Sequence, residues 1–188
     1  MNANTPLSDL ANALATERDR AFPDLVRSLQ DDVYTGVLRM LGNPADAEEV
    51  AQEAFVRAYH ALGGYPPERV RSLGLRSWVW TIAANQARNR ARTRRRKPEA
   101  ALDTAPNPTA PGPGPEEAAM TSSGLAELAA ALTGLPWVMR TAVVLRHVLD
   151  MTYDEIAAAL NRPIGTVKSD VHRGLERLRS TLNPGETQ

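Results

Sequence analysis

Apolar residues recur at helical spacing along most of the chain, and no stretch shows the sustained alternation with β-branched residues that predicts a strand. Between Ala21 and Leu41 they form one stripe, and Gly42 ends the pattern. The next segment, 43–46, begins a second helix, because Asn43 can cap it, a proline suits the first helical turn and an acid follows at the positive helix end. This helix is predicted to run to about Leu62.

A turn-rich stretch with two glycines and two prolines follows, and a third helix is predicted to begin between Leu73 and Ser77. The pattern places Trp78 on the apolar stripe of this helix and Trp80 toward the other side, where basic and amide side chains gather. We expect Trp78 to pack in the core. Trp80 fits either core packing or a surface on which an unpaired base can stack.

The middle of the chain has a different composition. Residues 98–115 contain six prolines and no basic residue, which is typical of a segment that cannot bury enough apolar surface to fold and acts as a tether. We therefore predict an all-α protein with two small helical domains, at 18–97 and 121–183, joined by a flexible linker at 98–120.

The second domain is predicted to start with a helix near Thr121 and to continue with another over about 137–149. Its last part has the pattern of a helix-turn-helix: Thr152 and Glu155 can form a capping box, and Asn161 can adopt the left-handed conformation in the turn. In the final helix the apolar positions point inward, which leaves polar and basic side chains facing outward, as a helix lying in a major groove requires.

Charge and composition narrow the possible functions. The 188 residues carry equal numbers of acidic and basic groups, yet residues 71–98 contain nine basic residues and no acidic one, which indicates a local site for a polyanion. The absence of cysteine excludes thiolate metal sites and cysteine nucleophiles. No metal site or cofactor is expected, because the three histidines are widely separated and no phosphate-binding glycine loop is present. No run of apolar residues is long enough to span a bilayer, so we expect a cytoplasmic protein.

Three segments, in this order, resemble the extracytoplasmic-function (ECF) sigma factors of the sigma-70 family. They are residues 43–55, residues 78–85 with the arginine run after them, and the second domain from Leu135-Pro136 through 153–157 to 165–169. The resemblance spans about 21–97 and 121–182. It implies a sigma factor that is not an enzyme, that binds core RNA polymerase and promoter DNA, and that has an anti-sigma factor as a partner.

The resemblance also implies a role for each surface. The outer face of the second helix would bind core polymerase through Asp46, Glu49, Gln52, Glu53, Val56 and Arg57. The third helix would recognise and melt the −10 element, where DNA is single-stranded, through Trp80, Asn85, Arg88, Asn89, Arg92, Arg95 and Arg96. The last helix would read double-stranded −35 DNA through Thr166, Lys168, Ser169, Asp170, His172 and Arg173.

Two features depart from the family pattern. The stretch from Tyr65 to Arg76 is longer than the usual connector, and Asp170 stands where the family commonly has an arginine. Asp170 could accept a hydrogen bond from a cytosine amino group, or it could pair with Arg173 or Arg162 and hold that side chain in position.

Three rival functions remain. A helix-turn-helix regulator that acts without polymerase explains only the second domain. An enzyme finds little support, since helix capping accounts for the Asp154 and Glu155 pair. An adaptor protein requires the basic block to be dispensable.

Overall fold

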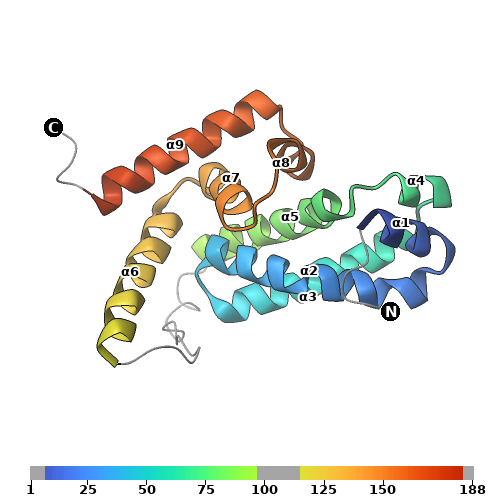
Figure 1. Cartoon of the computed structure of the whole chain (residues 1–188), viewed down its shortest axis with the longest axis horizontal. Coiled ribbons are helices and arrows are strands. Elements are labelled where there is room, and N and C mark those ends of the chain that lie inside the picture. The colour runs from blue at the N-terminus through green and yellow to red at the C-terminus, as the bar shows by residue number, and fades with distance from the viewer. Residues whose placement is uncertain (1–6, 97–114, 184–188) are drawn as a thin grey trace.

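The computed structural model describes residues 7–96 and 115–183, and within these ranges all regular structure is α-helical (Figure 1). The predicted all-α class is therefore confirmed. In chain order the helices are α1 (Leu7–Thr16), α2 (Arg18–Leu41), α3 (Pro44–Gly63), α4 (Pro67–Arg71), α5 (Leu75–Arg96), α6 (Pro115–Gly134), α7 (Trp137–His147), α8 (Tyr153–Leu160) and α9 (Ile164–Leu182).

The first module is built on α2, α3 and α5, which pack against one another along their apolar stripes. The predicted end of α2 and the predicted start of α3 are confirmed. Gly42 has φ 69°, the left-handed conformation that glycine adopts without strain, and its N–H donates to the carbonyl of Leu38. The side chain of Asn43 then caps α3 by accepting a hydrogen bond of 2.9 Å from the N–H of Asp46.

Two short helices of this module were not predicted. Helix α1 buries Leu10, Ala11 and Leu14 and packs against α2 and α4, so the first module begins well before residue 18. Helix α4 begins at Pro67, directly after the predicted turn, which the structure has at 64–66. Helix α4 has only five residues, too few to show a period, whereas α1 carries apolar residues at the helical spacing 7, 10, 11 and 14, a signal that we did not use. Packing against the rest of the module stabilises both helices.

The second module comprises α6 to α9, and its predicted capping motifs are confirmed. Glu155 donates its N–H to Thr152 Oγ1 at 3.2 Å, and its carboxylate accepts from the Thr152 N–H at 2.8 Å. Asn161 ends α8 with φ 50°. Helix α6 begins at Pro115, earlier than the expected start at Thr121. Most of the predicted linker lies outside the described residues.

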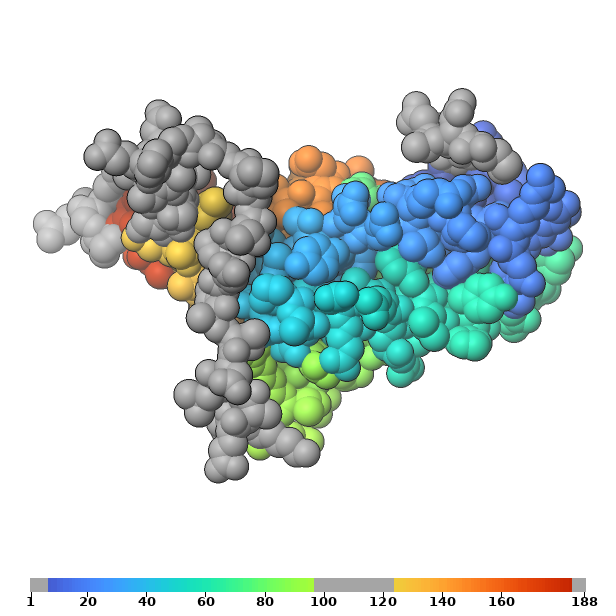
Figure 2. All heavy atoms as spheres, turned by 90° about the horizontal axis from the view of Figure 1, so that it is seen from below, coloured from blue at the N-terminus to red at the C-terminus, as the bar shows by residue number. Residues whose placement is uncertain are grey.

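The two modules contact each other directly. Helices α7 and α8 of the second module lie against α2 and α5 of the first, while α9 lies on the side away from the first module (Figure 1). Figure 2 shows the molecule from below, where α2 and α3 lie side by side. No helix within the described ranges is long and apolar enough to cross a membrane.

Candidate protein-binding and nucleic-acid-binding surfaces

The outer face of α3 is exposed as predicted. The Val56 side chain is 51% exposed, which is unusual for a large apolar residue surrounded by charged neighbours. Glu53 and Arg57 form an ion pair of 2.6 Å along the helix, and Gln52 lies on the same exposed side. These side chains are off the core stripe, so a partner can contact them without disturbing the fold.

Asp46 differs from the exposed members of the predicted polymerase-binding set, because it is largely buried against two arginines of another helix. Its carboxylate forms ion pairs of 2.7 Å with Arg90 Nε and 3.0 Å with Arg94 Nη1, and the side chain is only 14% exposed. Glu49 also accepts from Arg90, at 3.0 Å. The hydrogen bond from Arg90 to Asp46 raises the pKa of this guanidinium above its usual range. Asp46 therefore joins the start of α3 to the end of α5, a cross-helix contact that the sequence pattern did not reveal.

The basic residues of α5 from Arg88 onward are divided between two sides of the helix. Arg90 and Arg94 face α3. The other side chains, which are the predicted −10 residues other than Trp80, are exposed: Asn85, Arg88, Asn89, Arg92, Arg95 and Arg96. The described structure thus brings an amide and guanidinium surface together on one helix, and its chemistry suits phosphates and unpaired bases.

The placement of the two tryptophans differs from the pattern. Trp80, which the pattern put toward the outer side of α5 while core packing stayed open, is fully buried, so the core alternative holds. Trp78, expected in the core, is half-buried and packs against the core from outside it. The physical reason is that α5 is covered on two sides, by α2 and α3 within its own module and by α8 from the second module. A single apolar stripe, as we predicted, accounts for only one of these contacts.

The connector before α5 has a defined structure. Arg69 from α4 lies over the ring of Tyr65, with 3.7 Å from its guanidinium carbon to the ring centroid. Tyr65 also meets Trp78 edge to face, with the centroids 6.1 Å apart. These aromatic groups lie beside the start of α5.

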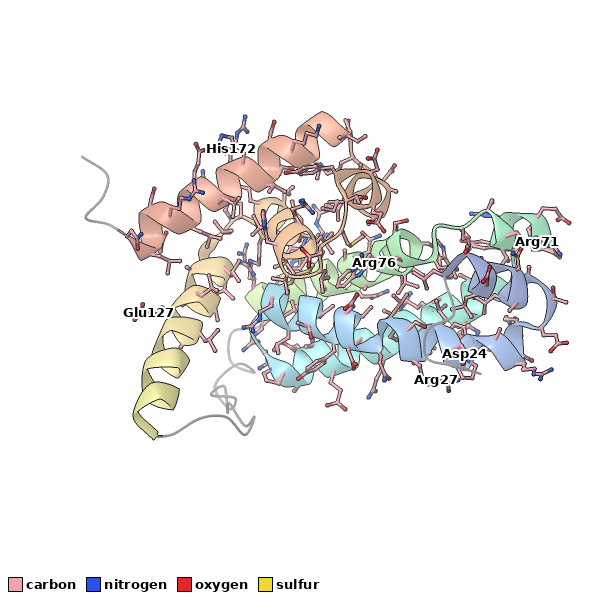
Figure 3. The ribbon with its side chains drawn as sticks, viewed as in Figure 1. Asp24, Arg27, Arg71, Arg76, Glu127 and His172 are labelled. Atoms are coloured by element: carbon pink, nitrogen blue, oxygen red, sulfur yellow. The ribbon has the colours of Figure 1, made fainter. Side chains whose placement is uncertain are left out.

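The outward face of α9 presents four exposed polar or basic side chains, Lys168, Ser169, His172 and Arg173, with Thr166 half-buried beside them. His172 projects away from the rest of the molecule (Figure 3). Its Nε2 lies 3.7 Å from a carboxylate oxygen of Glu176. This face has the size and chemistry of a helix that reads a major groove.

Asp170 points toward the turn of the helix-turn-helix instead. It is 8% exposed, and its carboxylate forms an ion pair with Arg162, the residue after the turn residue Asn161. From the sequence we expected Asp170 either to read a base or to pair with Arg173 or Arg162 and hold that side chain in position. The structure has the pair with Arg162. Whether Asp170 also reads a base stays a prediction.

The described residues contain no group of histidines and acids that could hold a metal ion. The exposed faces of α3, α5 and α9 offer a partner charged groups, hydrogen-bond donors and hydrogen-bond acceptors.

The chain was compared with known protein families and with curated proteins. Residues 25–97 match the model of Sigma-70 region 2, and residues 125–178 match that of Sigma-70, region 4. The ECF RNA polymerase sigma factor SigW of Bacillus subtilis is 36% identical over 172 residues, which cover 86% of this chain and 89% of SigW. The ECF RNA polymerase sigma-E factor of Escherichia coli is 32% identical, with 88% of each chain covered.

Solved structures agree with these matches. The structure of CnrH in complex with the cytosolic domain of CnrY has a TM-score of 0.70 and 25% identity, and the match covers 98% of this chain and 100% of the other. The fold also matches the sigma factor RpoE of Bartonella quintana, solved with the anti-sigma factor NepR, with a TM-score of 0.67, 22% identity and coverage of 89% and 99%. With both regions matched and relatives aligned over most of their length, the chain belongs to the sigma-70 family, among its ECF sigma factors.

Proposed function

We propose that this protein is a sigma factor that binds core RNA polymerase and directs transcription initiation at specific promoters. The observation that carries the proposal is the presence of three separate exposed surfaces on the two matched regions. The outer face of α3 suits a protein partner, the outer face of α5 suits melted −10 DNA, and the outer face of α9 suits double-stranded −35 DNA.

The proposed mechanism uses binding energy only. Taking a base out of the stack costs a few kcal/mol. Stacking of captured bases returns about 1–3 kcal/mol each, and arginine contacts to phosphates add to it. Strand opening therefore requires no hydrolysis by this chain, which acts as an initiation factor and not as an enzyme.

The outer face of α3 gives the first test. Glu53→Arg combined with Gln52→Ala reverses the charge at its centre without touching the core. We expect this variant to lose co-purification with core polymerase while its helical content and melting temperature stay nearly unchanged. Asp31→Arg, at an exposed acid of α2, is the matched control and should retain binding. Retained binding by the double variant would show that α3 is not the docking helix.

The decisive experiment is run-off transcription with purified core polymerase on genomic fragments, followed by mapping of the start sites. A sigma factor yields transcripts whose start sites share upstream elements. A helix-turn-helix regulator that acts without polymerase would instead protect a defined operator by itself and yield no transcripts. The acidic docking face and the amide and guanidinium face of α5 favour the first outcome, because that regulator has no use for them.

An anti-sigma factor is a further proposed partner. Two matched structures, those of CnrH and RpoE, were solved with CnrY and NepR respectively, and NepR is an anti-sigma factor. The role proposed here also places the protein in the bacterial cytoplasm, where polymerase and promoter DNA are found.

A further inference from the structure

The ring of Tyr153 attracts a cation from each of the two neighbouring helices. Tyr153 is the first residue of α8 and is half-buried against the core. The guanidinium carbon of Arg146, in the last turn of α7, lies 5.3 Å from the ring centroid, and Nζ of Lys168 on α9 lies 5.6 Å from it. Both distances are within the range of about 6 Å in which an aromatic face attracts a cation. Figure 1 shows α8 beside the start of α9, so the ring joins the two helices of the helix-turn-helix.

The ring is held in place by contacts that do not involve Lys168. Thr152, the residue before it, caps α8 by accepting a hydrogen bond of 3.2 Å from the N–H of Glu155. Nη1 of Arg146 donates to the carbonyl of Met151 at 3.1 Å. Lys168 has a flexible four-carbon stem, its side chain is exposed, and within the described residues it forms no ion pair. The ring is therefore the fixed partner, and the lysine is the side chain that it orients.

Lys168 lies at the border of the outward face of α9. It precedes the buried Val171 by three positions and the half-buried Leu175 by seven, so it shares the side of the helix next to the core. Ser169, on the outward face, points about 100° away from it at about 3.6 residues per turn. Because Tyr153 belongs to α8, its ring holds the ammonium group on the α8 side of this face.

The two helices of a helix-turn-helix meet different parts of the duplex. The second helix lies in the major groove, and the first crosses the backbone. An ammonium group on the α8 side of α9 therefore lies at the edge of the groove, next to the phosphates, whereas Ser169 and Arg173 lie nearer the base edges. Phosphate contacts fix the position of the protein and carry no sequence information directly. The task of Lys168 is thus distinct from that of its neighbours.

We propose that Tyr153 is a positioning residue that directs Lys168 to a phosphate of the −35 element, so that Lys168 supplies affinity rather than base recognition. The proposal rests on the proposed function for the identity of the DNA. It divides the outward face of α9 into a phosphate-binding edge and a base-reading centre. The ring acts before DNA arrives, since a side chain that is already oriented loses less rotational freedom on binding.

The ring contact can be tested without DNA, because the chain contains only two lysines, Lys97 and Lys168. Isotope-labelled lysine gives two sets of side-chain signals in the nuclear magnetic resonance spectrum of the full chain, and Lys168→Met removes one set and so assigns it. The ring current of an aromatic face shifts the signals of nearby protons upfield. We expect this shift for the protons on Cε of Lys168 in the unaltered chain and in Tyr153→Phe, which keeps the ring. It should be lost in Tyr153→Leu.

The second arm is a double-mutant cycle. Holoenzyme assembled from each variant and core polymerase is bound, at several salt concentrations, to a promoter mapped by run-off transcription. Tyr153→Leu should weaken binding about two- to fivefold, the effect of an exposed cation–ring contact. Lys168→Met should reduce the log-log salt slope by about 0.9, the effect of one phosphate contact. Because the tyrosine acts through the lysine, adding Tyr153→Leu to Lys168→Met should change binding by less than about twofold.

Two controls accompany the cycle. Tyr153→Phe keeps the ring and should bind promoter as the unaltered chain does. Arg20→Met removes one exposed cation of α2, which pairs with Glu17, and should leave the salt slope unchanged. Thermal unfolding of Tyr153→Leu measures any loss of packing, which would weaken binding equally with and without Lys168.

Each outcome bears on one proposal. An unshifted Lys168 signal in the unaltered chain, or one that stays shifted in Tyr153→Leu, overturns the ring contact. Tighter binding by Tyr153→Leu, or losses that add in full in the double variant, overturn the positioning role. A relaxed preference at one base pair in Lys168→Met, measured with a randomised −35 library, overturns the assignment to a phosphate. Absence of promoter-directed transcription by the unaltered chain overturns the proposed function, whereas the lysine signals still decide the ring contact.

Discussion

Removing the carboxylate of Asp170 tests whether this residue holds the helix-turn-helix together. Asp170→Ala leaves Arg162 without its partner in a partly buried site, where the two side chains are 12% and 33% exposed. Exposed ion pairs contribute up to about 1 kcal/mol, and breaking a buried pair costs about 3 kcal/mol or more. With one partner largely buried and the other a third exposed, we expect a loss of about 2 kcal/mol. For a chain of this size that lowers Tm by about 4–8 °C.

The assay has a stability arm and a specificity arm. Thermal unfolding of Asp170→Ala is compared with that of Glu176→Ala, which removes an exposed carboxylate from the same helix and should change stability by less than about 0.5 kcal/mol. A library with a randomised −35 element is then transcribed with each variant. If Asp170 only positions Arg162, the preferred −35 sequence stays the same and transcription falls evenly. A change of preferred base at one position, with an unchanged Tm, would refute this reasoning.

Three further predictions follow from other contacts. Asn43→Ala removes the cap of α3 and should lower the free energy of unfolding by about 1–2 kcal/mol, as measured by urea denaturation. Arg95→Ala with Arg96→Ala should weaken binding to all promoters and reduce the log-log salt slope by about 0.9 for each phosphate that these arginines no longer neutralise, whereas Asn85→Ala should impair opening at −10 bases selectively. The hydrogen bond from Arg18, and to a smaller extent that from Tyr59, lowers the pKa of Asp19 in the folded chain. The ionised carboxylate therefore stabilises the fold above its unfolded pKa of about 3.9, and this stabilisation is lost as the pH falls below that value. Asp19→Asn should therefore flatten the decline of Tm below about pH 4, and an unchanged decline would contradict the assignment.

The sequence predicted the elements whose signals are local. Gly42 and Asn43 mark the end of one helix and the start of the next, and Thr152 with Glu155 forms the expected capping box, because a cap depends on residues only a few positions apart. The outward face of α9 also follows from its own periodicity. Asp170 is the exception on that helix, since its partner lies in the preceding turn.

The failures share a physical cause, which is contact between elements distant in the chain. Trp80 is buried where its indole meets Gly36 of α2, with Leu149 of the second module beside it, and no pattern within α5 records those neighbours. Asp46 meets Arg90 and Arg94 more than forty positions away, at 2.7 and 3.0 Å. Periodicity assigns a face to each residue of a helix, but the neighbours of that face depend on the tertiary fold.

The ion pairs of Asp46 have a mechanical consequence. They tie the start of α3 to Arg90 and Arg94 of α5, so the proposed polymerase-docking helix and the proposed −10 helix turn as one rigid lever. Asn85 lies nine residues from Arg94, which is about 13 Å along α5 at about 1.5 Å per residue. A tilt of about 5° where polymerase holds α3 would displace Asn85 by about 1 Å, enough to lengthen a hydrogen bond from about 2.9 Å beyond its usual range. The angle at which polymerase seats α3 would then set how well α5 captures a base, so promoter opening would respond to small changes in seating that leave polymerase affinity unaltered.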